Sequence, residues 1–368
     1  MSLFWIVFLV VILVSVRARR DPPPRANQGR REPHPTAAIT ALSAAYLVFA
    51  AWTFVAWYRK HHPLAKYKWG GDGWLESWTY AGGADKFGHA WATMALARLG
   101  TTILHDWGGF AKRNSSLVSA GLSELLFTGV EVKDGFYYEF SFSDLTGDTT
   151  GMLLALLFDN SARANELFGF RVEYAPSEMY QRKVAGTSPC PSGGCSRWNV
   201  AEDYSGQTYL AALHLAGIKT VRKHLGVASR FVDVAVGFDS RNYKPNPDPD
   251  IVEKPHQDVF LGLAFNAQGW CDWLLEGRDS PAAERARYVL HGLFEVFNLP
   301  YGSVRLLSTG REKSGPAPLK SSERGPHHTR ALKALAAAGA SAVPKGSRAR
   351  DIAPTRTRPR SSRGAGRG

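Results

Sequence analysis

The chain has few cysteines and lacks the common nucleotide and hydrolase motifs. Its 368 residues include three cysteines, Cys190, Cys195 and Cys271. No second pair of metal ligands lies near the first two in sequence, so we expect no structural zinc site. Cys190 and Cys195 enclose a short Pro-Ser-Gly-Gly loop, which could close as a disulfide in an oxidising compartment or hold two free thiols. Gly-x-Ser-x-Gly, a P-loop and a Rossmann glycine pattern are all missing, which argues against the enzymes that carry them.

The folded part of the chain also lacks an excess of charge. The formal net charge is +13, but residues 311–368 hold fourteen Lys and Arg against three acids, and residues 1–32 hold six against two. Residues 33–310 therefore have a net charge of −2. A nucleic-acid-binding protein needs a basic face on its fold, and none is visible, so we expect no nucleic acid partner. We expect the basic tail from 311 to 368 to be disordered.

Two apolar runs near the N-terminus point to a membrane or an export signal. Residues 3–16 are short for a membrane span, and residues 1–20 suit a signal peptide or a signal anchor. No cysteine follows this run, so a lipid anchor there is not supported. Residues 21–36 form a Pro/Arg-rich linker. Residues 37–58 carry no charge and are long enough to cross a bilayer, which predicts membrane lipid as a partner; a buried core helix is the alternative.

Three further helices follow, according to the stop and start signals. We expect one from Asp85 to Trp107, one from after the Asn114-Ser115-Ser116 cap signal to about Gly135, and one from Ser141 or Ser143 to about Asp159. They are less apolar than the first run. They could be short spans, half-immersed helices or members of a soluble bundle.

Beyond residue 160 the pattern changes from helical to alternating. Period-two spacing predicts strands around 204–216, 230–239 and 257–266, and helical spacing returns over 281–298. The predicted fold class is therefore α+β. A membrane-associated antiparallel helical bundle covers 37–160, a small antiparallel-strand region lies within 161–310, and the basic tail follows.

Seven charged side chains fall at the ends of the three predicted helices. In an antiparallel arrangement, the start of one helix, the end of the next and the start of the third lie at one level, so these side chains should meet in one place. The set could ligate a divalent metal through carboxylates and one imidazole, or it could be a hydrogen-bonded network that locks helix ends together. In a catalytic version His89 is the general base and Lys86 the clamp for a phosphate or carboxylate. The candidate metal ligands are Asp85, His89, Glu131, Asp134, Asp144 and Asp148, and the candidate catalytic residues are His89, Lys86 and Glu131.

The same residues carry a family resemblance. The chain has Asp-Lys-x-x-His at 85–89, Glu-x-x-Asp-Gly-Phe at 131–136 and Asp-x-x-x-Asp-x-x-Gly at 144–151, and Asp-Tyr-Ser-Gly-Gln-Thr-Tyr at 203–209. Together they resemble the YfiM-like family of predicted periplasmic lipoproteins, a domain of unknown function, and more distantly VanZ-like membrane proteins. The resemblance covers roughly residues 37–310. It implies an envelope location and no activity.

Two functions are compatible with these features. The first is a non-enzymatic envelope protein, structural or an assembly partner. The second is an enzyme, a metal-assisted hydrolase or transferase, that acts on a lipid-linked or phosphate-bearing envelope substrate. A divalent metal is the cofactor that the second function predicts. We expect the protein to be membrane-associated and to face the periplasm, with a fully exported chain preferred.

Overall fold

The computed structural model describes residues 33–71, 73–76, 78–186, 199–243, 255–278 and 280–310. The predictions for the apolar run at 3–16, for the Cys190–Cys195 loop and for the tail from 311 fall outside these residues. Cys271, the remaining cysteine, is buried with a free thiol.

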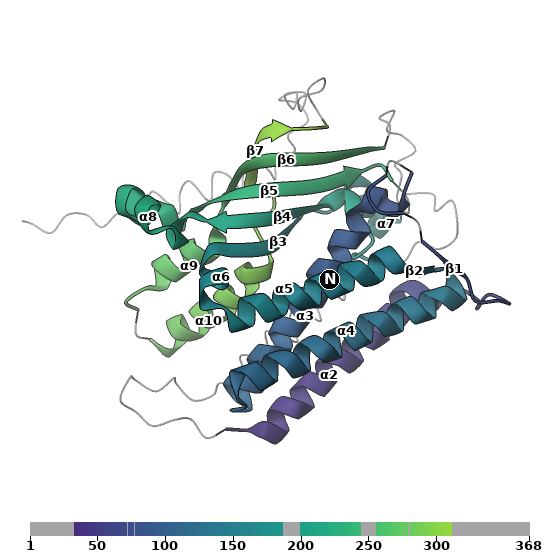
Figure 1. The fold of residues 1–368 in the computed structure, drawn as a ribbon, viewed down its shortest axis with the longest axis horizontal. Helices are drawn as coiled ribbons and strands as arrows, with labels where there is room; N and C mark the ends of the chain where they lie inside the picture. The colour runs from purple at the N-terminus through teal and green to yellow at the C-terminus, as the bar shows by residue number, and fades with distance from the viewer. Residues whose placement is uncertain are drawn as a thin grey trace, which may run out of the picture. The chain divides into compact units, whose positions relative to one another are not determined.

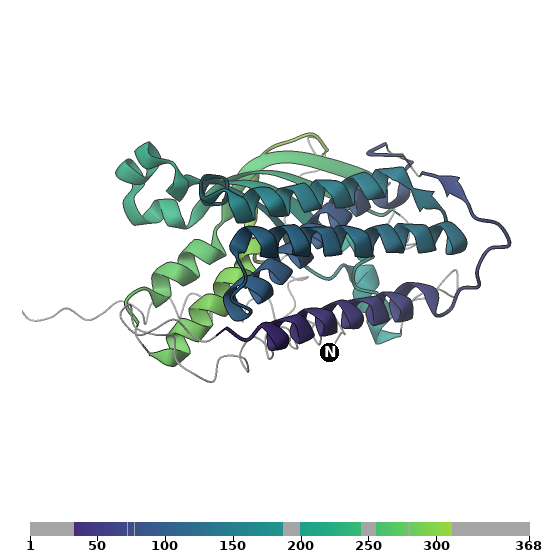
Figure 2. The same cartoon turned by 60° about the horizontal axis from the view of Figure 1, so that its bottom comes forward.

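Four long helices form the N-terminal part, as the sequence predicts (Figures 1 and 2). They are α2 (Pro35–Thr53), which continues as the π-helical turn η1 (Phe54–Tyr58), α3 (Ala84–Thr102), which continues as η3 (Ile103–Trp107), α4 (Lys112–Tyr137) and α5 (Phe142–Asn160). Helices α3, α4 and α5 pack on one another, with α3 and α5 starting at the end where α4 stops. Helix α2 lies alongside α4, where Phe49 meets Phe127 at 5.5 Å between ring centroids. Of these four, the stretch Pro35–Tyr58 is long and apolar enough to cross a membrane, and 22% of its most apolar window is buried.

One helix start differs from the prediction. The Asn114-Ser115-Ser116 sequence predicts the start of α4, but the helix already begins at Lys112 and its first residues have no side-chain cap. Ser115 and Ser116 are instead buried within the helix, where the hydroxyl of Ser116 accepts a hydrogen bond from Asn160 of α5. These small side chains therefore let α4 and α5 approach closely. Sequence spacing alone does not distinguish this role from helix capping.

The predicted start of α5 is confirmed. The hydroxyl of Ser141 accepts a hydrogen bond from the backbone N–H of Asp144 at 3.2 Å, which caps the helix. Two glycines then bring α5 against α3. A Cβ atom at Gly147 would lie 2.7 Å from the backbone oxygen of Lys86, and one at Gly151 would lie 2.1 Å from that of Ala90. Larger residues at these positions would push the two helices apart.

The C-terminal part is a five-stranded antiparallel sheet in the order β3-β4-β5-β6-β7. The strands are β3 (Phe168–Tyr174), β4 (Gln207–His214), β5 (Val232–Arg241), β6 (His256–Phe265) and β7 (Ser303–Ser308). The three predicted strands correspond to β4, β5 and β6, whereas β3 and β7 were not predicted. Shorter elements connect these parts: β1 (Trp69–Gly70), η2 (Tyr80–Gly83), β2 (Phe140–Ser141), α6 (Ala162–Leu167), α7 (Glu178–Ala185), η4 (Tyr204–Gly206), η5 (Leu215–Gly217), α8 (Lys219–Leu225), η6 (Gly226–Arg230), α9 (Ala267–Leu275) and α10 (Pro281–Val296).

Helix α3 packs on one face of strands β3, β4 and β5 through aromatic side chains. Phe87 stacks on Phe238 and on Tyr209, with ring centroids 4.6 and 5.8 Å apart. Phe170 and Val172 of β3 belong to the same buried cluster. Buried aromatic side chains contribute strongly to the stability of a protein core. Because this cluster includes residues of α3 and of the sheet, the helical bundle and the sheet share one core.

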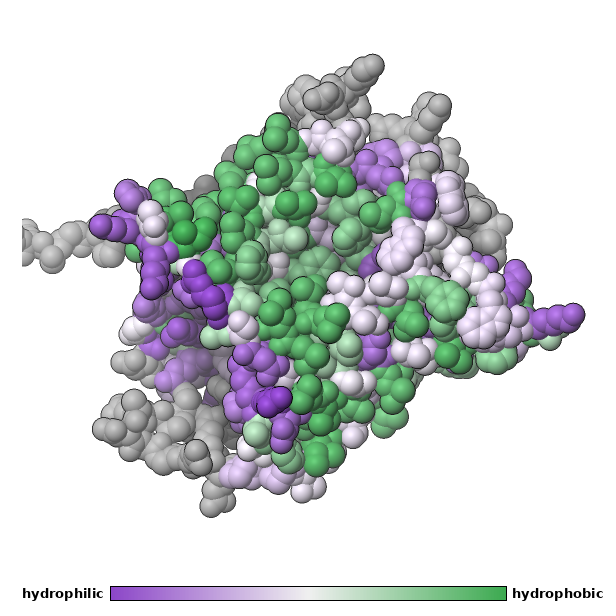
Figure 3. All heavy atoms as spheres, viewed as in Figure 1, coloured by the Kyte–Doolittle hydropathy of each residue, from purple (hydrophilic) through white to green (hydrophobic). Residues whose placement is uncertain are grey.

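Farther along, the same face of the sheet is open. Val236 of β5, Val259 and Leu261 of β6 and Leu306 of β7 are each more than two-fifths exposed. Figure 3 shows apolar side chains gathered over these strands and over the neighbouring helix α5. The opposite face holds buried charges instead, such as Arg171, which donates to Asp233 at 2.9 Å. The period-two alternation in the sequence is therefore confirmed, but in β5 and β6 part of its apolar side faces outward.

Candidate functional site

The first helix of the site is held in place by the sheet. Three residues before α3 have left-handed backbone angles: Ala81, Gly82 and Gly83, with φ of 51, 58 and 77°. The backbone oxygen of Ala81 accepts a hydrogen bond from Ser240 at 2.6 Å, and that of Gly82 accepts one from Gln257 at 2.8 Å. A reversal of this kind favours glycine because it has no Cβ. The turn fixes the start of α3 at the ends of β5 and β6, with Asp85 and Lys86 in the first turn of the helix.

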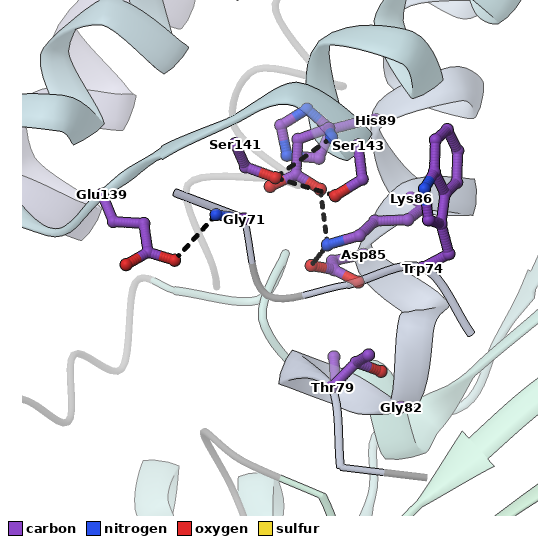
Figure 4. Close-up of polar contacts among 12 residues, drawn as sticks. Gly71, Trp74, Thr79, Gly82, Asp85, Lys86, His89, Glu139, Ser141 and Ser143 are labelled. Carbon is purple, nitrogen blue, oxygen red and sulfur yellow. Dashed lines mark hydrogen bonds and ion pairs between the residues drawn. The ribbon is translucent and has the colours of Figure 1, made fainter. Parts of the chain in front are cut away.

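Lys86 joins the starts of α3 and α5. Its Nζ lies 2.8 Å from Oδ2 of Asp85 and 2.8 Å from Oδ1 of Asp144. The side chains of Lys86 and Asp85 are 6% and 4% exposed, so water screens these ion pairs little. Figure 4 shows the ammonium group of Lys86 reaching Asp85, with Ser143 and His89 close by on the other side. The structure thus brings three of the predicted residues together as a buried, compensated ion-pair cluster.

His89, one turn farther along α3, forms a second cluster with α4 and α5. Its Nδ1 lies 3.0 Å from Oδ1 of Asp148, and its Nε2 lies 3.8 Å from Oε1 of Glu131. Oδ1 of Asp148 also accepts a hydrogen bond from the hydroxyl of Thr93 at 3.0 Å. One nitrogen or oxygen atom from each of His89, Glu131 and Asp148 lies within 4.8 Å of the other two. We call these three residues the His89 triad.

Two oxygen atoms of the His89 triad have no hydrogen-bond partner among the described residues. They are Oε1 of Glu131 and Oδ2 of Asp148, and both side chains are at most 1% exposed. The other oxygen of Glu131 accepts a hydrogen bond from the backbone N–H of Ser141 at 3.3 Å. A buried carboxylate oxygen without a partner costs free energy, and such an atom in a native protein commonly indicates a bound ion or a catalytic role.

The burial and the charges change the proton affinities of these groups. Burial alone would lower the pKa of His89, but the carboxylates of Asp148, Asp144 and Glu131 raise it well above its ordinary value. Burial raises the pKa of Glu131 to about 8, against the opposing effect of His89. At neutral pH, in the absence of a metal, His89 is therefore an imidazolium and Glu131 is protonated.

Asp134 lies at the same end of the bundle but has a different partner. Its Oδ1 accepts a hydrogen bond from the hydroxyl of Tyr58 at 2.6 Å. Burial raises the pKa of Asp134 to about 7, while the bond from Tyr58 and the charge of His89 act in the opposite direction. Asp134 thus links α4 to the C-terminal end of the first apolar helix, and it lies outside the triad.

The sequence did not single out three further side chains at this end as site residues: Thr93, Tyr58 and Ser141. Thr93 follows His89 by four residues, so it lies on the same face of α3, and that spacing could have identified it. Ser141 was expected only as a helix start. Tyr58 carries no signal in the sequence, because its partner Asp134 is 76 residues away.

An apolar cavity opens beside His89. Its volume is about 610 Å³. His89 forms part of its wall together with residues of α2, α3, the sheet and α10, most of them apolar. Pockets that bind small molecules have this size and this mixture of apolar walls with a few polar groups. His89 is the member of the triad that borders this space, which a ligand could occupy.

Comparison with known families relates part of the chain to a described family. Residues 71–160 match DUF2279, a family described as predicted periplasmic lipoproteins, and this stretch contains all seven predicted site residues. The match is consistent with an envelope protein of unknown activity. Neither the curated proteins nor the solved structures contain a match to this chain. The narrower YfiM-like and VanZ-like resemblances stay predictions.

Proposed function

We propose that the protein is a divalent-cation-dependent enzyme of the cell envelope, a hydrolase or transferase that acts on a lipid-linked or phosphate-bearing substrate. The His89 triad would hold the ion. The observation that carries this proposal is the pair of buried carboxylate oxygens, on Glu131 and Asp148, that lack hydrogen bonds beside an imidazole and a cavity.

The geometry of the triad is compatible with a shared ion. Transition-metal ions take imidazole nitrogen and carboxylate oxygen at about 2.0–2.2 Å, so two ligand atoms on one ion lie about 3–4 Å apart. His89 Nε2 and Glu131 Oε1 are separated by 3.8 Å. A mixed imidazole and carboxylate set suits Mn²⁺, Fe²⁺ or Zn²⁺ better than Ca²⁺. When bound, such an ion supplies Lewis acidity and an activated water.

Residues within and around the triad would orient its ligand atoms. Oδ1 of Asp148 would orient the ring of His89 through Nδ1, so that Nε2 faces Glu131, and Oδ2 of Asp148 would contact the ion. Lys86 is engaged by Asp85 and Asp144, which supports a compensating role over that of a substrate clamp. We therefore assign Asp85, Asp134 and Asp144 to positioning and keep His89 and Glu131 as the candidate catalytic residues.

Metal binding by the purified full chain tests this proposal. We expect one Mn²⁺ or Zn²⁺ ion per chain by elemental analysis, and a melting temperature that rises with added metal. A ligand at a hundred times its Kd stabilises a folded protein by about 2.7 kcal/mol. Glu131→Gln and Asp148→Asn should abolish both effects.

A matched control is available on α10. His291 also contacts a carboxylate, Asp272, at 2.8 Å, but this pair is partly exposed and lies outside the triad. His291→Ala should keep the metal, whereas His89→Ala should lose it. If the wild-type chain binds no ion and its melting temperature is insensitive to metals, the triad is a structural network and the enzyme proposal fails. If the chain does bind the ion, lipid and envelope profiling of a His89→Ala strain would identify the substrate class.

Location is the second part of the proposal. The apolar stretch Pro35–Tyr58 supports membrane association, and the match to predicted periplasmic lipoproteins supports the periplasmic side. Reporter fusions near residues 65 and 200 should both report export. An active cytoplasmic reporter at 200 would contradict it.

A non-enzymatic role as an assembly partner has its own supporting observation, the open apolar face of β5–β7. Contiguous exposed apolar surface commonly marks an interaction site. Replacing Leu261 and Leu306 by Ser should abolish cross-linking to an envelope partner if this role is correct. Unchanged cross-linking would remove the support.

A further inference from the structure

We infer that the cavity beside His89 is a binding groove for one hydrocarbon chain of a lipid, with the polar head of that lipid at the His89 triad. The inference that the lipid is a substrate rests on the proposed enzyme function. The inference that the groove binds a lipid rests on the residues that line the groove.

The groove follows α3. Its residues on this helix extend from Gly88 to Thr102, a length of about 20 Å at the rise of an α-helix. This length suits an extended hydrocarbon chain.

Small and apolar side chains form the floor and one wall of the groove. Ala92, Ala95 and Leu99 face it from α3, and Leu293 and Val296 face it from α10. These walls present mainly apolar surface, which favours a hydrocarbon chain there.

The charged residue midway along α3 is already neutralised. Arg98 also lines the groove, but it forms ion pairs with Glu295 and Asp159 and donates to Asn165 at 2.9 Å. Its ion pairs tie α3 to α5 and α10. Arg98 therefore does not provide a free charge for a second headgroup in the middle of the groove.

Two hydrogen bonds fix α10 as a wall of the groove, one at the C-terminal end of the helix and one at its middle. Near His89, the indole N–H of Trp91 donates to the backbone oxygen of Val296 at 2.7 Å. At the far end of the groove, the hydroxyl of Tyr288 donates to Asp106 at 2.8 Å. The wall that α10 provides should therefore keep its place whether or not the groove is filled.

Phe49 and Trp52 of α2 also line the groove, and this helix connects the groove to lipid. Its N-terminal part packs on η3 through Ala38 and Leu42, and its C-terminal part packs near α7 through Trp52. The outward side of the same helix exposes Leu47 and Phe54, at 70% and 47%. A helix that is apolar on its outward side and long enough to cross a membrane places the groove next to acyl chains. We therefore identify the occupant as a membrane lipid.

Two variants block the groove by different routes. Ala95→Phe adds a ring on the floor. Gly292→Leu adds a side chain on α10, where a Cβ would have no atom within 4 Å and where glycine is a poor helix former. This second variant should fold at least as well as the wild type. Ala282→Phe, on the exposed first turn of the same helix and outside the groove, is the matched control.

The assay is titration of the full chain, held in amphipol, with the fluorescent fatty acid cis-parinaric acid, together with native mass spectrometry for co-purifying lipid. We expect saturable binding of one probe per chain, at least tenfold weaker in Ala95→Phe and in Gly292→Leu and unchanged in Ala282→Phe. Absence of saturable binding by the wild type, or wild-type affinity in both blocked variants, would overturn the inference.

The two proposals can fail separately. His89→Ala and Glu131→Gln should lose the metal and keep the probe, because neither removes the apolar walls. A chain that binds metal but no probe would leave the metal site standing and refute the groove. A chain that binds the probe but no metal would refute the metal site and leave the groove standing.

Discussion

Replacing Gly151 by alanine should destabilise the protein, although the same substitution at a solvent-exposed position within a helix is stabilising. In the interior of a helix, glycine is about 1 kcal/mol less favourable than alanine. At Gly151 a Cβ would lie 2.1 Å from the backbone oxygen of Ala90 and 3.0 Å from its Cα. No rotation of a side chain relieves a contact with backbone, so α5 must move away from α3.

The expected size follows from these two effects. Overpacking in a close-packed interior costs about 1–3 kcal/mol, and a clash with backbone belongs at the upper end. After the gain in helix propensity, the net loss in free energy of unfolding is about 2 kcal/mol. At roughly 2–4 °C per kcal/mol for a chain of this size, the melting temperature should fall by about 4–8 °C.

Gly129 of α4 provides the matched control. It is exposed in the middle of a helix, and a Cβ there would have no atom within 4 Å. Gly129→Ala should therefore raise the free energy of unfolding by about 1 kcal/mol. Thermal unfolding of the two variants, followed by circular dichroism, should give shifts of opposite sign. If Gly151→Ala is as stable as Gly129→Ala, the close approach of α3 and α5 described above is incorrect.

The same displacement should reach the site. Asp148 precedes Gly151 by three residues, and its contact with His89 spans the same interface. Metal affinity should therefore fall in Gly151→Ala and stay unchanged in Gly129→Ala.

Two further substitutions test other parts of the fold. Burial raises the pKa of Glu173 to about 7 from its ordinary value of 4.5, although Ser303 and Asn298 donate to it. The folded state thus binds a proton that the unfolded state releases, so stability is lost as the pH rises from about 4.5 to 7. Glu173→Gln should be more stable than wild type above pH 7, by up to about 3 kcal/mol, and equal to it below pH 4.5 in denaturant titrations; a constant difference at all pH values would argue against a buried carboxylate there. Ser141→Ala removes the cap on the N–H of Asp144 and should cost about 1 kcal/mol in the same titrations, and no loss would show that the cap is not formed.

The sequence predicts the helical part of the fold well because its signals are local. The start of α5 depends on Ser141 and on an acid three residues later, both within one turn of the helix. The start of α3 at Ala84 lies one residue before Asp85, where the sequence predicts it. The serines of α4 misled the prediction because a buried serine and a capping serine look alike in sequence.

The two missed strands depend on distant partners. Strand β3 contains Arg171 and Glu173 among its buried residues, which hides the alternation expected of a strand. Arg171 is compensated by Asp233, 62 residues away, and Glu173 by Asn298, 125 residues away. A protein interior tolerates such charges when they are paired. A single sequence does not show which residues form the pairs, so it does not predict that these charges are buried in a strand.

The candidate site was predicted as one group of seven residues, and the structure separates it into smaller ones. Helix ends and spacing suffice to bring the side chains to one level. Whether Asp148 or Asp144 faces His89 depends on how α5 is rotated against α3, and the contacts at Gly147 and Gly151 fix that rotation. The predicted catalytic and metal roles stay predictions.

The last strand of the sheet has a consequence for how copies of this protein behave at high concentration. Among the described residues, β7 pairs with β6 alone, with an irregular register next to Gly262. Arg305, in the middle of β7, turns its guanidinium to Asp239 and Asp258 on the buried side of the sheet. A charge directed inward and an irregular register both discourage a neighbouring chain from adding a strand at an edge. Molecules brought together through their apolar faces could thus separate again, because the edge of the sheet would not convert a reversible encounter into a fibre.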